Sequence, residues 1–432
     1  MLASAVSGLR TVCLRHINTT PQIMYTQRHI ILFDTEESHS NLLPLSFTRP
    51  VAEFRIGITT LREKWESLLP GCYSYRPAGY LRDKFGDGPE EDCDDCLFVS
   101  GSILPDSHVA CLLEGLESGE ALTDTAGVLR GCRGTTQQCR KAVDMGPEAA
   151  GFRTSSAGSL RVIRYVFDIF LRNAEMIAED FERLTAGRRS AQLSDTVRVI
   201  GAGRRADSKI FVEEGASLEC VTVNLKDGPV YIGRGVQIME GASLRGPLAV
   251  CDNSKVKMGA RIYGGTTFGP YCKVGGEVDN TVIFGYSNKA HDGYLGNAVI
   301  GEWCNIGAGT NASNLKNDYS KIRIWNYATH SFMRTDLQFC GLIMGDHSKA
   351  GINCMFNTAT VVGVGCNIHG AGFPRVFIPS FSEGSATAGF SDVPMKKFCD
   401  IAERVMQRRN KHLNELDRHI LECIREAASK FK

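Results

Sequence analysis

The sequence predicts an α/β domain followed by a parallel β-helix and a helical C-terminal tail. Two observations lead to this prediction: strands mixed with helical stretches through about residue 165, and a strict six-residue period that begins at Ile232. A length of 432 residues also exceeds one compact core and indicates two or three domains. We expect a leader at 1–27, the α/β domain at 28–165, a linker helix at 166–204, the β-helix at 205–390 and the tail at 391–432.

The β-helix prediction rests on eight consecutive hexapeptides that run from residue 232 without a slip. A period of six matches neither a helix nor a hairpin, and it is typical of short strands that turn a corner and stack on the preceding coil. The first positions are all apolar: Ile232, Ile238, Leu244, Val250, Val256, Ile262, Phe268 and Val274. The pattern returns at Ile300 and again from Met344, after residues 311–340 interrupt it. Such a long excursion is usually functional or covers an interface.

Other segments show the periods of ordinary strands and helices. Residues 29–34 (HIILFD) are typical of a buried strand, and residues 61–69 of a helix that Thr60 and Glu63 begin with a capping box. Apolar residues at helical spacing over 165–184 predict the linker helix. The same spacing from Pro394 onward predicts an amphipathic tail, which we expect to cover the open edge of the last coil.

The composition narrows the class of partner. Lys and Arg number 49 against 48 Asp and Glu, a net charge of +1, so nothing indicates a nucleic acid or an anionic membrane as partner. No run of apolar residues reaches the length of a membrane-spanning helix. Several of the 16 cysteines occupy small apolar positions of the repeats, and we expect reduced thiols in an intracellular protein. The close pair Cys93 and Cys96 leaves a redox or zinc site open as an alternative.

The N-terminus bears on the compartment. No acidic residue precedes Asp34, whereas arginines do, and residues 1–23 therefore fit a mitochondrial presequence. The alternative is a leader upstream of a start at Met24, which would leave a cytoplasmic protein.

A histidine in a polar, glycine-flanked segment is the strongest catalytic candidate. His291 lies in NKAHDGYLGN, directly before the hexapeptide pattern resumes. Imidazole titrates near neutrality, so it suits removal of a proton from an amine; the alternative is a surface or interface histidine. Residues 305–310 (NIGAGT) form a glycine-rich corner that either approaches a ligand or simply turns a coil. The remaining β-helix histidines show no close spacing that predicts a metal site: His330, His347 and His369.

These segments resemble a known family. Residues 276–297 (GEVDNTVIFGYSNKAHDGYLGN) and 299–314 (VIGEWCNIGAGTNASN) follow, without a gap, the pattern VEVxxxxIGxxxxAxHxxYLGD, NIGAGT and an Asn. This is the pattern of the bacterial bifunctional N-acetylglucosamine-1-phosphate uridyltransferase/glucosamine-1-phosphate N-acetyltransferase. The resemblance covers about residues 28–425, and it is weaker before the β-helix than within it.

The resemblance implies a left-handed β-helix behind a shortened, nucleotidyltransferase-like α/β domain, in a homotrimer with sites between chains. It implies an amino-sugar phosphate as acceptor and acetyl-CoA as donor, with UTP and Mg²⁺ as further partners if the first domain is active. The implied roles are catalytic base for His291, sugar-phosphate contact for Tyr294, amino-sugar contact for Asn305, acetyl-CoA contact for Ala308 and substrate-side contact for Asn314.

Departures from the family concern both domains. The family's Lys after GEV is Asp279 here, so Lys273 becomes the candidate substitute for a sugar-phosphate contact, and Leu315 replaces a Tyr. In the first domain Arg49 remains, in LLPLSFTRP, as a candidate phosphate contact. The glycines of the family's phosphate-binding signature are missing, and Ser102 stands where a metal-binding Asp is expected, so no metal ligand is assigned.

Three functions remain open on this basis. The first is acetyl transfer from acetyl-CoA to glucosamine-1-phosphate, with or without uridylyl transfer to form UDP-N-acetylglucosamine. The second is a sugar-1-phosphate nucleotidyltransferase whose β-helix is regulatory. The third is a non-catalytic β-helix scaffold, which would have no reason to keep His291, Tyr294, Asn305 and Asn314 together.

Overall fold

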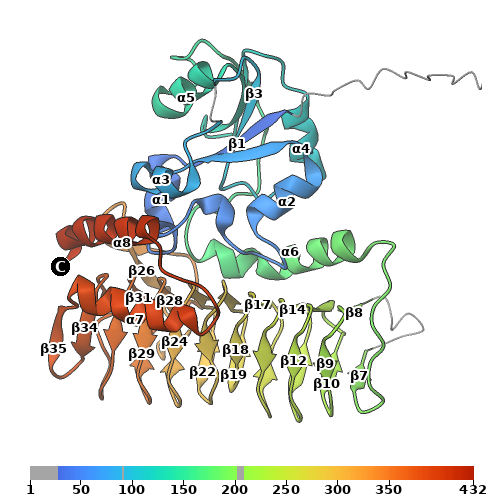
Figure 1. Ribbon diagram of the computed structural model, residues 1–432, viewed down its shortest axis with the longest axis vertical. Helices are drawn as coiled ribbons and strands as arrows, with labels where there is room; N and C mark the ends of the chain where they lie inside the picture. Colours follow the sequence, from blue (N-terminus) through green and yellow to red (C-terminus); the bar gives the residue numbers. More distant parts are fainter. Residues whose placement is uncertain (1–27, 90–91, 202–208) are drawn as a thin grey trace, which may run out of the picture.

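An α/β unit packs against one side of a long β-helix (Figure 1). The computed structural model describes residues 28–89, 92–201 and 209–432, and the predicted leader lies outside them. Helix α6 (Asp168–Thr185) lies between the α/β unit and the β-helix. No helix in the part of the chain described is both long enough and apolar enough to cross a bilayer.

The α/β unit has a six-stranded sheet in the order β2-β1-β3-β5-β4-β6. Its strands are β1 (His29–Phe33), β2 (Cys72–Arg76), β3 (Cys96–Ser100), β4 (Glu120–Thr123), β5 (Leu129–Gly134) and β6 (Arg153–Ser156). Its helices are α1 (Glu36–Asn41), α2 (Leu61–Leu68), α3 (Arg82–Phe85), α4 (Ser107–Glu114) and α5 (Thr136–Met145). β1 pairs in parallel with β2 and β3, and its apolar residues are buried because helices cover both sides. The predicted capping box is confirmed, since Thr60 and Glu63 each bond the other's backbone N–H.

The β-helix has three faces, and each coil except the last contributes one strand to each face. Face A contains β7 (Arg198–Ile200), β10 (Thr222–Asn224), β13 (Ser243–Arg245), β16 (Arg261–Ile262), β19 (Glu277–Asp279), β22 (Tyr294–Gly296), β25 (Asn311–Ala312) and β30 (Met355–Phe356). Face B contains β8 (Ile210–Val212), β11 (Val230–Ile232), β14 (Leu248–Val250), β17 (Thr266–Phe268), β20 (Val282–Ile283), β23 (Val299–Ile300), β28 (Ile343–Met344), β31 (Val361–Val362) and β33 (Phe377–Ile378). Face C contains β9 (Ser217–Leu218), β12 (Gln237–Ile238), β15 (Lys255–Val256), β18 (Lys273–Val274), β21 (Asn288–Lys289), β24 (Asn305–Ile306), β29 (Lys349–Ala350), β32 (Asn367–Ile368), β34 (Ser382–Ser385) and β35 (Gly389–Asp392).

The register explains the six-residue period. Strands of successive coils pair in parallel, so the first residue of a hexapeptide lies beside its equivalent one coil later on the same face, as Val256 does beside Val274. These apolar side chains point inward and fill the core, and Val256, Val274 and Phe268 are fully buried. The predicted fold class, an α/β domain with a parallel β-helix and C-terminal helices, is confirmed.

The excursion that interrupts the repeats covers an interface. It contains the hairpin of β26 (Arg323–Asn326) and β27 (Ser331–Arg334) and reaches the α/β unit. The Asn326 amide donates to Asn41 Oδ1 at 3.0 Å, and the Tyr327 ring packs edge-on against Phe47. Of the two roles expected for this excursion, covering an interface is therefore the one observed.

The tail is two helices and not one. Asn410, with φ of 53°, lies between α7 (Met395–Gln407) and α8 (Glu415–Ala428). α7 runs along the side of the last coils and not across their open end, with Phe398 packed on Phe381 (Figure 1). The expectation that the tail covers the last edge was wrong; β35 pairs there, antiparallel to β34.

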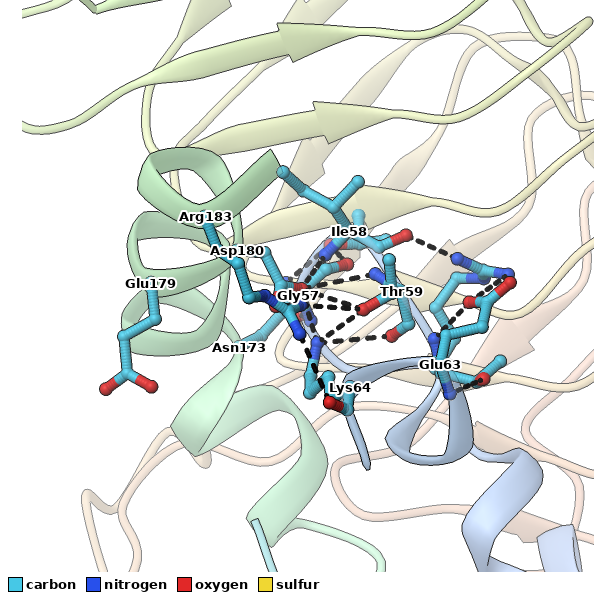
Figure 2. Close-up of polar contacts among 12 residues, drawn as sticks. Gly57, Ile58, Thr59, Glu63, Lys64, Asn173, Glu179, Asp180 and Arg183 are labelled. Atoms are coloured by element: carbon cyan, nitrogen blue, oxygen red, sulfur yellow. Dashed lines mark hydrogen bonds and ion pairs between the residues drawn. The ribbon is translucent and has the colours of Figure 1, made fainter. Parts of the chain in front are cut away.

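A buried carboxylate joins the α/β unit to α6 (Figure 2). Asp180 accepts hydrogen bonds from the N–H groups of Ile58 (2.8 Å) and Thr59 (3.2 Å), and it forms ion pairs with Lys64 and Arg183. Burial lowers the pKa of Lys64 to about 8, although the Asp180 carboxylate opposes this shift. The Asp180 carboxylate therefore stabilises the charged form of Lys64 that burial disfavours.

Asn173, two turns earlier on α6, extends this contact to the β-helix. Its side-chain oxygen accepts from Gly57 N–H at 2.7 Å, and its amide donates to Gly265 O at 2.7 Å and Thr267 Oγ1 at 3.0 Å. Thr267 belongs to β17, so one set of hydrogen bonds holds the loop of the α/β unit, α6 and face B together.

We expect Asp180→Ala to lower the free energy of unfolding by about 3–5 kcal/mol, because it leaves the Lys64 ammonium buried without its partner. Urea unfolding followed by fluorescence would measure the change. Glu182→Ala, an exposed carboxylate on the same helix, is the matched control and should stay within about 0.5 kcal/mol of the wild type. Equal midpoints for the two variants would contradict the role of Asp180.

Candidate active site

His291 lies on the corner between face C and face A. Four residues, 290–293, connect β21 to β22, whereas only Gly275 and Gly276 connect β18 to β19 in the preceding coil. The short corner forms a notch, a space that the backbone of the His291 corner occupies by packing against Gly276. The His291 side chain is exposed there, as a group that receives a proton from a bound substrate must be.

Two glycines let the His291 corner fold into this notch. A Cβ atom on Gly276 would come within 2.8 Å of the His291 carbonyl oxygen. Gly293 has φ of 124°, and a Cβ atom there would lie 2.0 Å from the Thr310 carbonyl oxygen. The position of His291 therefore depends on the absence of side chains at both residues.

A cavity of about 530 Å³ runs along face C from the His291 corner to the C-terminal end of α7. It gathers four of the residues that the sequence singled out: Lys273, His291, Asn305 and Ala308. The structure adds residues from the opposite corner, from the next coil and from α7: Trp303, Lys349, Ile352, Val405, Arg408 and Arg409. Residues far apart in the sequence thus line one cavity.

The charges lining this cavity are all positive. Lys273, Lys349, Arg408 and Arg409 face it, and no carboxylate is among the lining residues. Burial lowers the pKa of Lys273, and the nearby guanidinium groups of Arg409 and Arg408 lower it further. Arg409 donates to Asn288 Oδ1 at 3.4 Å, a neutral partner. Cations that repel one another without a compensating carboxylate favour an anionic ligand such as a phosphate.

The glycine-rich corner after Asn305 leaves one backbone donor for a ligand. Gly307 N–H donates to Ala350 O and Gly309 N–H to Asp292 O. Between them, Ala308 N–H donates no backbone hydrogen bond among the residues described. Because Ala308 lines the same cavity as His291, its amide is suited to hold an oxygen that becomes negative during acyl transfer.

Tyr294 and Asn314 lie around the corner, on the side of face A. The Asn314 amide donates to the Tyr294 hydroxyl at 2.9 Å and to Asn297 Oδ1 at 2.7 Å. Burial raises the pKa of Tyr294 to about 12, with a further contribution from the Asp279 carboxylate. Neither residue lines the cavity of His291, and the negative charge of Asp279 disfavours a phosphate beside Tyr294.

Arg49 lies at the interface of the two domains. It pairs with Glu302 (2.9 Å) and with Asp346, and Thr48 Oγ1 also donates to Asp346 at 2.8 Å. Burial opposes the charge, but the two carboxylates outweigh it and raise the pKa of Arg49. The Arg49 guanidinium thus binds the β-helix away from the His291 cavity. The carboxylates of Glu302 and Asp346 already compensate its charge.

The first domain does not offer the ligands that Mg²⁺ prefers. Asp34, at the end of β1, is buried and accepts from Val51 N–H, and burial raises its pKa to about 7. Ser102 contacts Ser100 at 3.0 Å and Arg130 at 3.3 Å where the family pattern expects an Asp. Over residues 28–89, 92–201 and 209–432, no three His, Cys, Asp or Glu side chains are grouped to hold a metal ion. These residues do not fit a magnesium site.

The basic residues that follow α7 escaped the sequence analysis. Arg408 and Arg409 fall within the apolar spacing of the tail, where charged residues between the apolar positions are typical of a solvated helix face. The absence of any compensating acid beside them was the available signal, but only the path of α7 brings them to face C. Trp303 was hidden because it occupies a corner position within a regular hexapeptide.

Comparisons with known proteins found similar sequences and structures. A family model described as sugar nucleotidyl transferase matches residues 30–189. Bifunctional protein GlmU of Trichodesmium erythraeum is 34% identical over 86 residues, which are 19% of this chain and 18% of that protein. GlmU of Wolbachia pipientis wMel is 34% identical over 122 residues, 24% of this chain and 28% of that protein. The chain thus spans less than a third of these relatives' length.

A solved structure of Francisella novicida UDP-N-acetylglucosamine acyltransferase is similar over 56% of this chain and 79% of that one. The two sequences are 10% identical, and the TM-score is 0.26. By its matches and its fold, the chain joins a sugar nucleotidyl transferase-type domain to a hexapeptide β-helix. Together the findings support a GlmU-like family, at low identity and over part of each chain.

Gly293→Ala should destabilise the protein more than Gly259→Ala. Both glycines have positive φ, but a Cβ atom on Gly259 would meet nothing within 4 Å. Strain alone predicts a loss of about 1 kcal/mol at Gly259, and the clash with Thr310 O raises the loss at Gly293 to roughly 3 kcal/mol. Urea unfolding of both variants would test this, and equal losses would contradict the tight packing of the His291 corner.

Proposed function

We propose that this protein transfers the acetyl group of acetyl-CoA to the amine of glucosamine-1-phosphate. The observation that carries the proposal is the cavity of face C, which combines His291, an available Ala308 amide and four cations without a carboxylate. Both substrates carry phosphate, and the cations match that charge. The partial likeness to GlmU proteins supports the same type of reaction.

The reaction follows from the placement of these groups. The acceptor nitrogen attacks the thioester carbonyl carbon, and the His291 imidazole accepts the proton that this nitrogen loses as the C–N bond forms. The carbonyl oxygen, now negative, accepts from Ala308 N–H, an interaction worth about 3 kcal/mol. The C–S bond breaks as the carbonyl reforms, and the thiolate of coenzyme A leaves and takes up the proton that His291 holds. Asn305, beside Ala308, orients the amino sugar.

Tyr294 and Asn314 are part of the proposal as acceptor contacts, although they lie on the other side of the corner. A homotrimer would place the corner of one β-helix against a face of the next, which is the arrangement that the family resemblance implies. A single chain presents His291 on an exposed corner, and a neighbouring chain would complete the enclosure of the substrates.

Uridylyl transfer is a second candidate, favoured by the match of residues 30–189 to the sugar nucleotidyl transferase model. The surroundings of Asp34 and Ser102 do not fit the magnesium ion that such a transfer requires. The proposed activity is therefore the acetyl transfer at the β-helix.

His291→Asn should lower the rate of coenzyme A release from acetyl-CoA and glucosamine-1-phosphate by at least about a hundredfold, because the general base is lost. His369→Asn is the matched control, since His369 is exposed on the same line of corners, further along the β-helix. Absence of release by the folded wild type across several amino sugars would refute the proposal and favour a nucleotidyltransferase or a scaffold.

Arg409→Ala should raise the KM for acetyl-CoA about tenfold or more with a smaller change in kcat. A hydrogen bond between a guanidinium and a phosphate contributes about 1.5–3 kcal/mol to binding. Arg404→Ala removes an exposed arginine of α7 that does not line the cavity, and its KM should stay at the wild-type value. An unchanged KM for acetyl-CoA in Arg409→Ala would contradict the binding of acetyl-CoA by Arg409.

A further inference from the structure

Lys289 interrupts the apolar core of the β-helix directly beneath the His291 corner. It pairs with Val274 of the preceding coil, and Ile306 follows at the equivalent place in the next coil. All three side chains are buried, and Lys289 is only 2% exposed. The family pattern quoted above has Ala at this position, so the ammonium is a particular feature of this chain.

The ammonium of Lys289 lacks the partner that usually accompanies a buried charge. Two lysines are buried in the part of the chain described, and the other, Lys64, is paired with the Asp180 carboxylate. Lys289 donates to a neutral group, the His291 carbonyl oxygen, at 2.5 Å. Burial lowers the pKa of Lys289 to about 8, the Asp292 carboxylate opposes this shift, and the Arg261 guanidinium adds to it. A buried cation in a repeat that otherwise selects apolar residues opposes folding and indicates a functional site.

The bond to the His291 carbonyl connects this cation to the proposed chemistry. That carbonyl oxygen also faces Gly276 across the notch, so it is held between the preceding coil and the ammonium. The His291 ring projects from the same backbone unit into the cavity. Lys289 therefore acts on His291 through the backbone, by fixing the carbonyl oxygen of its corner.

We propose that Lys289 is a positioning residue for His291, which anchors the corner of residues 290–293 and so holds the imidazole at the cavity. This inference rests on the proposed function. The other charged groups near this corner are Asp292 and the cations of the cavity, Lys273 and Arg409 among them.

Lys289→Met tests the proposal, because methionine keeps the length of the side chain and fits an apolar core. We expect kcat for acetyl transfer to fall about tenfold or more, with the KM for acetyl-CoA within about twofold of the wild type, because only the placement of the base changes.

The thermal midpoint separates positioning from a structural role. The folded-state pKa of Lys289 lies below its unfolded value, so the wild type bears the cost of a buried charge below pH 8 and loses that cost as the pH rises toward 10.5. Lys289→Met should therefore unfold at an equal or higher temperature than the wild type, most clearly below pH 8. Lys226→Met, at an exposed lysine of the β-helix, is the control and should not change the rate of acetyl transfer.

A readout independent of catalysis separates this proposal from the acetyltransferase itself. The imidazole resonances of His291, assigned by their loss in His291→Asn, would be compared by NMR between the wild type and Lys289→Met. Shifted imidazole resonances in the variant support the proposal even if the wild type transfers no acetyl group, a result that would refute the proposed function alone. Unchanged resonances, wild-type kcat, or a lower thermal midpoint in both Lys289→Met and Lys289→Ala would overturn the role of Lys289.

Discussion

The relation between the two domains depends on the buried carboxylate of Asp180. It satisfies two backbone N–H groups of the loop at Ile58, neutralises Lys64 and binds Arg183, so one side chain holds α6 against the α/β unit. Asn173 extends the contact to face B. With this frame fixed, Arg49 can meet Glu302 and Asp346 on the β-helix. A charged contact of this kind requires exact complementarity, because an unpaired ion would remain buried if the domains separated only partly.

The LLPLSFTRP segment of the first domain contacts the β-helix. Thr48 and Arg49 bond the β-helix, and Phe47 contacts Tyr327 of the excursion. The first domain matches the sugar nucleotidyl transferase model, but the residues around Asp34 do not suit a metal ion. The chemistry of this domain must therefore be judged from the side chains present and not from the fold.

The repeating half of the fold was predictable from sequence because its strands recur at fixed spacing. The family resemblance, and not the repeat, singled out Lys273, His291, Asn305 and Ala308; the register explains why they line one cavity, because residues at equivalent places of successive coils become neighbours. The partners of Arg49, the turn that carries Tyr294 away from the cavity, and the approach of Arg408 depend on packing between distant segments, which no local pattern encodes. The break at Asn410 within the tail was missed for a similar reason, since the apolar spacing continues across it.

The short corner at Gly275 and Gly276 shows how a monotonous scaffold acquires a distinct location. Its strands β18 and β19 keep their pairing with the coils on either side, so the loss of two residues from the corner leaves the stack intact. The short corner is thus accommodated at a single coil, without a new loop or a rearranged core. A repeat architecture can in this way change its surface locally while the stacking of the neighbouring coils, and the stability that depends on it, is kept.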